Sequence, residues 1–474
     1  MTPTTAPPVS RRLRARVGRG LAYALAAVLL PLVVGAAGAG AHFAGFRLGD
    51  PTPPPYAGPL PEPPAHDPAR RTAVIVAANS GTEGTDFLAP YEVLATSGAF
   101  NLYAVAPERR LTHLFPGAQS QRGVDFVPHY SFAEYDRAFG AAPDLIVVPY
   151  MPFDQAPEYQ VILDWIRANA GPDTTLLTIC GGLLNLADTG LLDGRTATTH
   201  HNVFAPMRER HPEVRLVEGV RYVEDGKLIS SAGITAGVDA TLHTLGRMLG
   251  PAAAASVAGR LGYPYAHFLA DPTYALPVPR GPGVLLNAYR VGKTALGVAL
   301  YPGIGEIELG SVIDTYPRSI TAVNHTVAPE RTAIVSRNGL ALVPRWSFAD
   351  APGLDRLLIP GLAVEEATRQ SFARWSAGRG GPAAELIHAA GGYPYDRTLA
   401  DMAAREGANV VEHAAYILEY PTGGATLDAP AYPAGMVARP VLLALLGLGL
   451  AYALDRRGLA RRAARLRGAG AGAA

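Results

Sequence analysis

The chain has 474 residues, which exceeds the length of one ordinary domain, and 49% of them are hydrophobic while 17% are charged. This composition excludes a chain that is disordered throughout. The single cysteine, Cys180, excludes an internal disulfide and any multi-cysteine zinc site.

The net charge of +1 hides a strong asymmetry along the chain. Residues 1–19 contain five Arg and residues 456–474 contain six, and neither tail contains an acidic residue. The remaining middle of the chain has 30 basic and 40 acidic side chains, so it is acidic. A nucleic-acid-binding body is expected to be basic, so we predict no nucleic-acid partner.

Two apolar segments predict membrane-spanning helices. Residues 20–42 contain no Asp, Glu, Lys or Arg and are long enough to cross a hydrocarbon core of about 30 Å; the second candidate is residues 434–454. The positive-inside rule places the basic tails, 1–19 and 455–474, in the cytoplasm and residues 47–433 outside the cell membrane. The alternatives are a cleaved signal peptide for the first segment and a buried core helix for the second.

Pro-rich stretches adjoin both apolar segments. Residues 47–69 contain nine prolines between positions 51 and 68, and residues 422–433 have a similar composition. Such stretches are semi-rigid, extended spacers, so we expect two stalks. Residues 269–289, which also contain prolines, are expected to link two folded domains.

The first folded domain, residues 70–268, has the pattern of an α/β protein. Short apolar runs at 72–78, 144–148 and 174–179 predict strands, and residues 161–169 have a helical pattern. Buried strands that alternate with helices predict a parallel sheet covered on both faces. Reactive groups in such sheets collect at the carboxyl ends of the strands.

Cys180 lies at such a strand end. It follows the strand expected at 174–179 and precedes Gly181, Gly182 and a helix that is expected to start near residue 183. A nucleophile on a tight strand-to-helix turn is exposed, and a helix N-terminus favours a thiolate, so we expect a lowered pKa for Cys180. The alternative is a buried structural cysteine.

Three stretches make the first domain resemble a known family. They are TDFLAPYEVL (85–94), TICGGLLNLADTGLLDGRTATTHH (178–201) and RYVEDGKLISSAGITAGVDATLHTLGRMLG (221–250). They resemble, in order over residues 72–265, the ThiJ/PfpI superfamily of glutamine-amidotransferase-like proteins. The most similar branch contains isonitrile hydratases and the amidase-like halves of AraC-type regulators. The resemblance implies a flavodoxin-like parallel-sheet sandwich with the cysteine on a nucleophile elbow.

The resemblance also implies a set of site residues. Cys180 matches the family nucleophile, while Asp86 and Glu92 match acids that contact the cysteine or the reacting water. His200 matches a family histidine after the elbow, and His201 is an equal choice by chemistry. The alternatives are a helix cap for Asp86 and an ordinary polar loop residue for His200. No metal and no organic cofactor are implied.

One position departs from the family pattern. Members that resemble peptidases have His directly after the cysteine, and members that resemble hydratases have Thr or Ser. This chain has Gly181 there, which supplies no side chain. The departure counts against a peptidase and also against a simple transfer of hydratase activity.

Residues 290–421 look like a second, damaged copy of the first domain. Residues 72–109 align without gaps to 294–331, and GVDFVPHYSFAE (123–134) matches GLALVPRWSFAD (339–350). Further along, Cys180 falls on Ala390, and the equivalent of residues 183–238 is missing. We therefore expect a tandem of sandwiches whose second copy is truncated and catalytically dead, docked on the first as an intrachain pseudo-dimer. The alternative is chance similarity.

These observations predict a membrane-anchored, extracytoplasmic cysteine hydrolase or hydratase of the ThiJ/PfpI type. Its partner would be a small-molecule substrate, a carbon–nitrogen or carbonyl compound attacked by Cys180. The rival hypothesis is a non-catalytic ectodomain that binds a ligand or senses oxidants or electrophiles through the cysteine.

Overall fold

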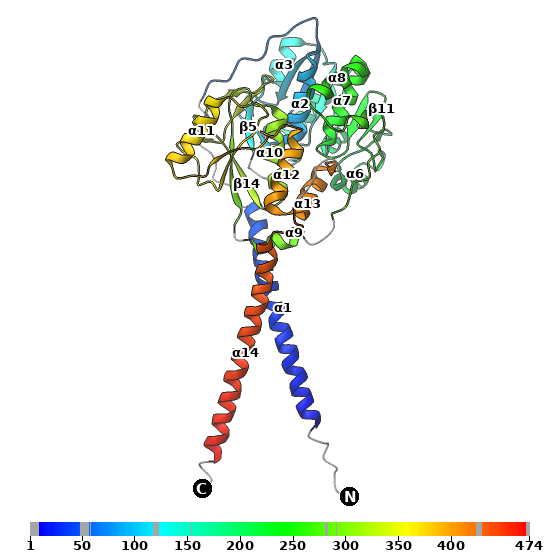
Figure 1. The fold of residues 1–474 in the computed structure, drawn as a ribbon. Coiled ribbons are helices and arrows are strands. Elements are labelled where there is room, and N and C mark those ends of the chain that lie inside the picture. The colour runs from blue at the N-terminus through cyan, green and yellow to red at the C-terminus, as the bar shows by residue number, and fades with distance from the viewer. Residues whose placement is uncertain are drawn as a thin grey trace. The chain divides into compact units, whose positions relative to one another are not determined.

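The computed structural model describes residues 9–47, 56, 58–116, 123–152, 154–279, 283–290, 292–422 and 429–470. The chain divides into two compact units. The terminal-helix unit contains α1 (Val9–Arg47), α14 (Ala434–Gly470) and the short helix α9 (Gly283–Leu286). The globular unit contains the sheets and the remaining long helices, labelled in Figure 1.

The two terminal helices are long and apolar enough to cross a membrane, over Arg16–Ala41 and Ala434–Gly458. Only 6% of each apolar window is buried, so neither is a buried core helix. Inside this unit the helices approach closely, because a Cβ atom on Gly447 would lie 2.2 Å from the carbonyl oxygen of Ala26. Small residues allow such close helix contacts in membranes.

The first sheet has seven strands in the order β11-β12-β8-β7-β1-β3-β6. All neighbouring strands in it are parallel except β11 and β12. The strands are β1 (Arg71–Val76), β3 (Phe100–Ala106), β6 (Tyr130–Ser131), β7 (Leu145–Val148), β8 (Thr175–Thr178), β11 (Tyr222–Asp225) and β12 (Leu228–Ser231). The predicted strands at 72–78, 144–148 and 174–179 are therefore present as β1, β7 and β8.

Helices cover both faces of this sheet, because side chains alternate along each strand. Ala73 and Ile75 of β1 pack with α2 (Gly84–Ser97), α7 (Ala236–Leu249) and α8 (Pro251–Arg260). Val74 and Val76 belong to the other core. That core packs with α3 (Phe132–Phe139), α4 (Tyr159–Asn169), α5 (Gly182–Ala187) and α6 (Phe204–Arg210). The domain is a three-layer α/β sandwich.

The second sheet has five parallel strands in the order β17-β14-β13-β18-β19. They are β13 (Thr294–Ala299), β14 (Ala322–Ala328), β17 (Trp346–Ser347), β18 (Arg356–Ile359) and β19 (Ala384–Leu386). The helices of this half are α10 (Glu306–Arg318), α11 (Glu366–Gly378), α12 (Pro394–Glu406) and α13 (Ala408–Leu418). In chain order these strands follow the arrangement β6-β3-β1-β7-β8 of the first sheet, without counterparts of β12 and β11.

A third sheet, β15-β16-β5-β4-β2, contains strands from both halves. Its strands are β2 (Thr82–Glu83), β4 (Thr112–Phe115), β5 (Val124–Val127), β15 (Ile334–Val335) and β16 (Ala341–Val343). β5 and β16 pair antiparallel with Phe126 opposite Leu342. These two residues are also equivalent in the sequence match between 123–134 and 339–350, so matching strands pair about their common centre.

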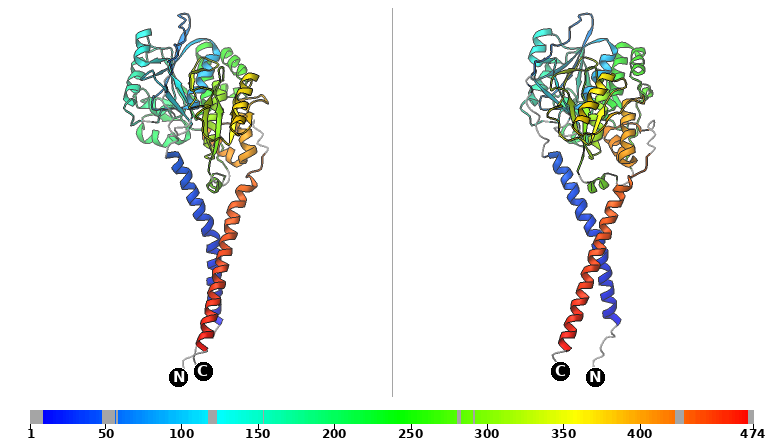
Figure 2. Two further views of the ribbon diagram at one scale, coloured as in Figure 1. Left: turned by 90° about the vertical axis from the view of Figure 1, so that its left-hand side faces the viewer. Right: turned by 60° about the vertical axis from the view of Figure 1, so that its left-hand side comes forward.

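The two halves share one hydrophobic core. Helices α2 and α10 pack against each other in the middle of the globular unit, and Gly310 of α10 lies beside Leu88 of α2. One cluster of buried side chains runs from Phe87 and Leu88 to Ile313 and Leu399. Figure 2 shows the elements of the first half, in cyan to green, side by side with those of the second, in yellow to orange. The contact between the halves therefore contains a continuous apolar core.

Backbone hydrogen bonds correct two details of the sequence alignment. Ile179 N donates to Val148 O, and Ile387 N donates to Ile359 O, so the residue that corresponds to Cys180 is His388 and not Ala390. Along β1 the ungapped alignment is wrong by one residue. It matches Ala77 with Ala299, but Ala77 N donates to β3 and it is Leu300 N that makes the equivalent bond to β14. Sequence similarity alone does not detect a one-residue shift that the strand register reveals.

The described part of the Pro-rich stretch before the first sheet, residues 56 and 58–69, is irregular, and part of it packs against the domain. His66 contacts the Tyr103 hydroxyl at 3.1 Å, and Asp67 N donates to Asn101 at 2.9 Å. Its C-terminal part is therefore attached to β3 and is not a free spacer. In the second expected stalk, residues 423–428 lie outside the described residues.

Candidate functional site

Cys180 sits on a strained turn between β8 and α5. Its φ angle is 56°, in the left-handed region that a residue with a side chain rarely adopts. The glycines that follow are required by close packing, because a Cβ on Gly182 would lie 2.0 Å from Val148 O. A Cβ on Gly181 would lie 2.5 Å from the Tyr150 ring. The ring of Tyr150 therefore occupies the space that a side chain after the cysteine would need.

Hydrogen bonds from two other segments, and one within the turn, hold the elbow in place. Cys180 N donates to Ser231 Oγ at 3.1 Å, and Thr199 Oγ1 donates to Cys180 O at 2.7 Å. The backbone N–H of Gly181 donates to the Cys180 sulfur. The residue is only 5% exposed, so the thiol is fixed inside the protein.

Three carboxyl groups and one guanidinium lie buried next to the elbow, and we call them the acid cluster: Glu83, Asp86, Asp314 and Arg318. Arg318 contacts Glu83 Oε1 at 2.7 Å and Asp314 Oδ1 at 2.9 Å. Glu83 caps α2 by accepting from Asp86 N at 2.7 Å, and Asp86 Oδ2 accepts from Tyr150 N at 3.2 Å. Asp86 is therefore not the helix cap. Asp314 and Arg318 come from α10, so the second half completes the cluster.

Arg318 supplies a single positive charge to the acid cluster. This charge cannot balance three ionised carboxyls and a thiolate together. Burial, followed by the nearby Asp86 and Glu83, raises the pKa of Cys180 well above its usual value. Burial also raises the pKa values of Glu83 and Asp86, despite the nearby Arg318. The expectation of an acidic Cys180 is therefore wrong for this state: the six-residue helix α5 does not offset burial and neighbouring acids. The cluster can hold protons beside a neutral thiol.

Glu92 is not part of the acid cluster. Its carboxylate accepts from Ile307 N at 2.6 Å and pairs with Arg337 Nη1 at 3.1 Å. Burial and the nearby Glu306 raise its pKa to about 8. The structure thus places Glu92 at the contact between α2 and the second half, where it caps α10, and does not bring it to the thiol.

His200 is buried and fully hydrogen-bonded. One ring nitrogen, Nε2, contacts Ile417 O at 2.8 Å, and the other, Nδ1, accepts from Asn202 N at 3.2 Å. Burial lowers its pKa to about 4, so the ring is neutral. His200 therefore anchors the end of α13 to the first domain, and a catalytic role for it stays a prediction.

The neighbouring His201 has a different environment. Its Nδ1 contacts Glu419 Oε1 at 2.8 Å, and its backbone N donates to the same oxygen at 2.8 Å. One ligand atom from each of His200, His201 and Glu419 lie within 4.8 Å of one another, a spacing that metal ions use. A metal bound by His200 would have to displace one of the two hydrogen bonds of its ring, so this trio fits an ion poorly.

Sequence reasoning named Asp86 but missed Glu83, Asp314 and Arg318 as neighbours of Cys180. Glu83 lies three residues before Asp86, a spacing typical of a helix cap, and this signal was available. Arg318 and Asp314 are far away in sequence, and only the docking of α10 on α2 brings them to the elbow. Glu419 gives no signal, because it follows the end of α13 in an ordinary stretch of sequence.

Known proteins are similar to the first domain of this chain. The DJ-1/PfpI family matches residues 71–246. An isonitrile hydratase from Pseudomonas putida is 29% identical over 182 residues, 38% of this chain and 72% of that protein. The HTH-type transcriptional regulator CdhR from Pseudomonas aeruginosa is 34% identical over 96 residues, 20% of this chain and 28% of that protein. The chain thus spans about a quarter of that regulator's length.

Two solved structures are similar to part of this chain. Drosophila melanogaster DJ-1beta covers 40% of this chain with 97% of its own length, at 20% identity and a TM-score of 0.35. A ThiJ/PfpI family protein from Pseudomonas syringae covers 48% of this chain with 87% of its own length, at 20% identity and a TM-score of 0.36.

The parallel sheet, the two helical layers and the cysteine on a strained strand-to-helix turn define a class of α/β proteins with an elbow cysteine. Within that class, residues 71–246 form a DJ-1/PfpI family domain. The expected resemblance to ThiJ/PfpI proteins is therefore confirmed.

We predict that Arg318→Met lowers the free energy of unfolding by about 3–5 kcal/mol, because it leaves buried carboxyls without their cation. The carboxyls must then be protonated to stay buried. Groups whose folded pKa is raised stabilise the fold at low pH, and this contribution is lost as pH rises through the folded pKa. The destabilisation should therefore be larger at pH 8 than at pH 5 in denaturant titrations.

A matched control is Arg167→Met, which removes an exposed pair with Asp164. That change should alter the free energy of unfolding by less than about 1 kcal/mol at either pH. Equal effects of the two substitutions would show that Arg318 is not needed to bury the acid cluster.

We also predict that the alkylation rate of Cys180 by iodoacetamide rises with a midpoint above that of a free cysteine, about 8.5, because burial and the acids disfavour the thiolate. Asp86→Asn should shift this midpoint downward, since it removes the largest carboxyl contribution to the raised pKa. Glu224→Gln, on β11 outside the cluster, should leave it unchanged. A midpoint below 8.5 in the unsubstituted protein would contradict the raised pKa.

Proposed function

We propose that the chain is a membrane-anchored, extracytoplasmic cysteine hydrolase or hydratase of the DJ-1/PfpI type, acting on a small carbon–nitrogen or carbonyl compound. The observation that carries this proposal is Cys180 at a φ of 56° beside buried acids with raised pKa values. A strained backbone at the cysteine and buried carboxyls beside it both destabilise the fold. Such destabilising arrangements are concentrated at functional sites. The isonitrile hydratase relative supports a carbon–nitrogen substrate.

The first step would be addition of the thiol to the electrophilic carbon. The sulfur forms a bond to carbon while one pair of the carbon–heteroatom multiple bond moves to the nitrogen or oxygen. Protonated Asp86 gives a proton to that heteroatom, and the thiol proton replaces it on Asp86. The N–H of Gly181, which donates to the sulfur, stabilises negative charge there as the proton leaves. In hydrolysis of an amide, the C–N bond then breaks and the amine leaves with a proton from Asp86, which the hydroxyl formed in the first step replaces. Water adds to the same carbon, the carbon–sulfur bond breaks, and a proton lost by water passes to the sulfur and restores the thiol. In hydration no group other than the sulfur leaves.

We further propose that residues 290–421 are a shortened copy of the first domain, docked as an intrachain pseudo-dimer. The matching strand order of the two sheets and the pairing of β5 with β16 about Phe126 and Leu342 support this proposal. A two-fold interface brings the same element of each partner together, as α2 and α10 meet here. His388, where the first domain has Cys180, leaves the second half without a nucleophile.

The membrane proposal rests on the two apolar terminal helices and the Arg clusters next to them. Arginine-rich flanks favour the cytoplasmic side, so both termini would be cytoplasmic and the sandwiches outside. The first helix would then be a retained anchor and not a cleaved signal peptide.

The second candidate is a non-catalytic, ligand-binding or electrophile-sensing ectodomain. Ligand binding without catalysis is compatible with the raised pKa and 5% exposure of Cys180, because a neutral buried thiol reacts slowly. The same observations count against a sensor of oxidants, which needs an accessible thiolate. Turnover of small substrates separates the two candidates.

We predict that Cys180→Ser abolishes turnover of small isonitriles, amides or aldehydes by the full chain in detergent. Asp86→Asn should lower kcat/KM by about 10²–10⁴-fold, as expected for a lost proton donor. His243→Gln, at a surface pair with Glu224, should have no effect. Turnover that survives Cys180→Ser would refute the cysteine mechanism, and absence of turnover with every substrate would favour the ectodomain hypothesis.

For the topology, alkaline phosphatase fused after residue 60 should be active and the same reporter fused after residue 470 inactive. The reason is that the basic flanks keep residues 1–19 and 455–474 on the cytoplasmic side. Activity only in the second fusion would invert the proposed orientation, and a membrane-bound protein whose N-terminus lies after residue 41 would point to cleavage of the first helix.

A further inference from the structure

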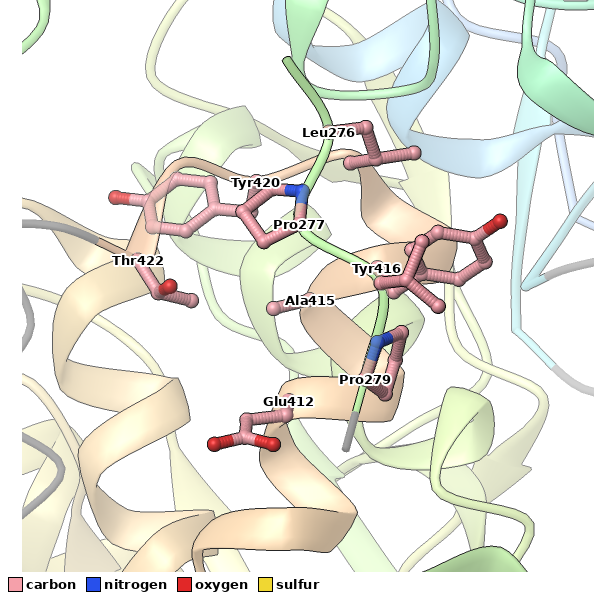
Figure 3. Close-up of a pocket in the computed structure, with 9 residues that line it drawn as sticks. Leu276, Pro277, Pro279, Glu412, Ala415, Tyr416, Tyr420 and Thr422 are labelled. Carbon is pink, nitrogen blue, oxygen red and sulfur yellow. The ribbon is translucent and has the colours of Figure 1, made fainter. Parts of the chain in front are cut away.

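The Cys180 thiol lies under a cover of other side chains, because the residue is only 5% exposed. Two cavities lie close to the end of α13. One, of about 410 Å³, is lined by Thr199, and the other, of about 290 Å³, lies between the 276–279 segment and α13 (Figure 3). Cys180 lines neither of them. A compound that reacts at the sulfur therefore has to displace a side chain that covers the elbow.

Among the side chains that the structure places against the elbow, Tyr150 differs from the others. Val148, Thr199 and Ser231 are buried, and Thr199 and Ser231 are held by hydrogen bonds to the backbone of Cys180. Tyr150 is partly exposed, and its hydroxyl makes no hydrogen bond within the described part of the chain. Its ring can therefore move without breaking a hydrogen bond.

The Tyr150 ring lies directly against the turn that carries the thiol. A Cβ atom on Gly181 would lie 2.5–2.8 Å from three carbons of this ring, and the N–H of Gly181 donates to the Cys180 sulfur. The backbone of Tyr150 is fixed, because its N–H donates to Asp86 Oδ2 at 3.2 Å and its carbonyl accepts from Glu83 N at 2.9 Å. Rotation of the side chain alone thus uncovers the turn and leaves the acids in place.

The second half indicates that the fold does not need an aromatic side chain at this position. Backbone hydrogen bonds at the ends of β7 and β18 match Val148 with Ile359, so Tyr150 corresponds to Gly361. The half with His388 at the strand end therefore has no side chain where the half with the thiol has a ring. This difference links the ring to the thiol.

The hydroxyl of Tyr150 stays protonated at neutral pH. Burial raises the pKa of Tyr150 to about 12, and a negative charge on Cys180 contributes to this rise. The group is therefore neutral and does not act as a base toward the thiol. Its effect on the site depends on the space that the ring fills.

We propose that Tyr150 is the residue that determines which compounds reach Cys180. Its ring covers the thiol and turns aside to admit a compound whose reacting carbon has no bulky substituent. The cover requires only the thiol, whereas its effect on substrates rests on the proposed cysteine chemistry. The alternative is entry from the larger cavity past Thr199, which would break the 2.7 Å hydrogen bond of Thr199 to the Cys180 carbonyl.

The test is alkylation of the full chain in detergent, which reports on Cys180 alone because the chain has one cysteine. Profiles of rate against pH are measured with iodoacetamide, which is narrow, and with N-ethylmaleimide, which is a ring. The plateau of each profile reports access and its midpoint reports the thiol pKa. A cover that is open in about 10% of molecules or fewer slows a reaction about tenfold or more. Tyr150→Ala should therefore raise both plateaus about tenfold or more, and that for N-ethylmaleimide further.

Two variants are controls for this measurement. Tyr150→Phe keeps the ring and should leave both plateaus unchanged. Tyr130→Ala removes another partly buried tyrosine, on β6 at the far edge of the same sheet, and should also leave them unchanged. Unchanged plateaus in Tyr150→Ala would overturn the proposal and favour entry past Thr199, and equal acceleration by Tyr130→Ala would also overturn it. If Tyr150→Ala does not fold, Tyr150→Leu should still accelerate N-ethylmaleimide more than iodoacetamide.

Turnover tests the effect on substrates separately. If the unsubstituted protein hydrolyses acetamide, Tyr150→Ala should raise kcat/KM for trimethylacetamide relative to acetamide. An unchanged ratio would overturn the role of Tyr150 in specificity. Absence of turnover with every substrate would refute the enzyme and leave the alkylation result to decide whether Tyr150 covers the thiol, so the two failures are distinguishable.

Discussion

The ion pair between Arg318 and Glu83 is the interaction on which the site depends. Arg318 lies on α10 of the second half, and Glu83 caps the helix that carries Asp86 in the first half. Removing three carboxyls and a thiol from water is unfavourable without a nearby cation. The first domain can therefore bury its acids beside Cys180 only while α10 is docked against α2. This dependence gives a physical reason for a half without a nucleophile to be retained.

The two halves use equivalent positions for different purposes. In the first, a cysteine follows the last residue of the strand and stands beside Asp86. In the second, His388 takes that position and is fully buried, with Nδ1 accepting from Gly361 N and Nε2 near Ser311 and Thr398. Burial lowers its pKa to about 4, so it is a neutral structural residue. The charged groups that the second half contributes to the acid cluster, Asp314 and Arg318, lie on α10 and not at the end of β19.

The sequence predicted most of the first domain because its signals are local. Apolar strands, the two glycines after Cys180 and the helix at 161–169 all depend on neighbours in the chain, and each is present. The charge balance of the site was not predictable in this way. The pKa of Cys180 is set by Asp86 and Glu83 together with burial, and the burial requires α10, more than 120 residues away. The sequence also did not show that the alignment of β1 with β13 is wrong by one residue, since similar apolar residues occur at both registers.

A raised thiol pKa changes how the elbow should be understood. If the thiolate were the resting form, the acids beside it would have to be protonated or displaced, because like charges in a buried site repel. The raised pKa values instead keep protons on the acids and on the sulfur, so that no net negative charge forms next to the strained Cys180. Chemistry at such a site requires that proton transfer accompany the attack on carbon. A carbon–nitrogen or carbonyl group meets this requirement, because its heteroatom accepts a proton as the new bond to sulfur forms.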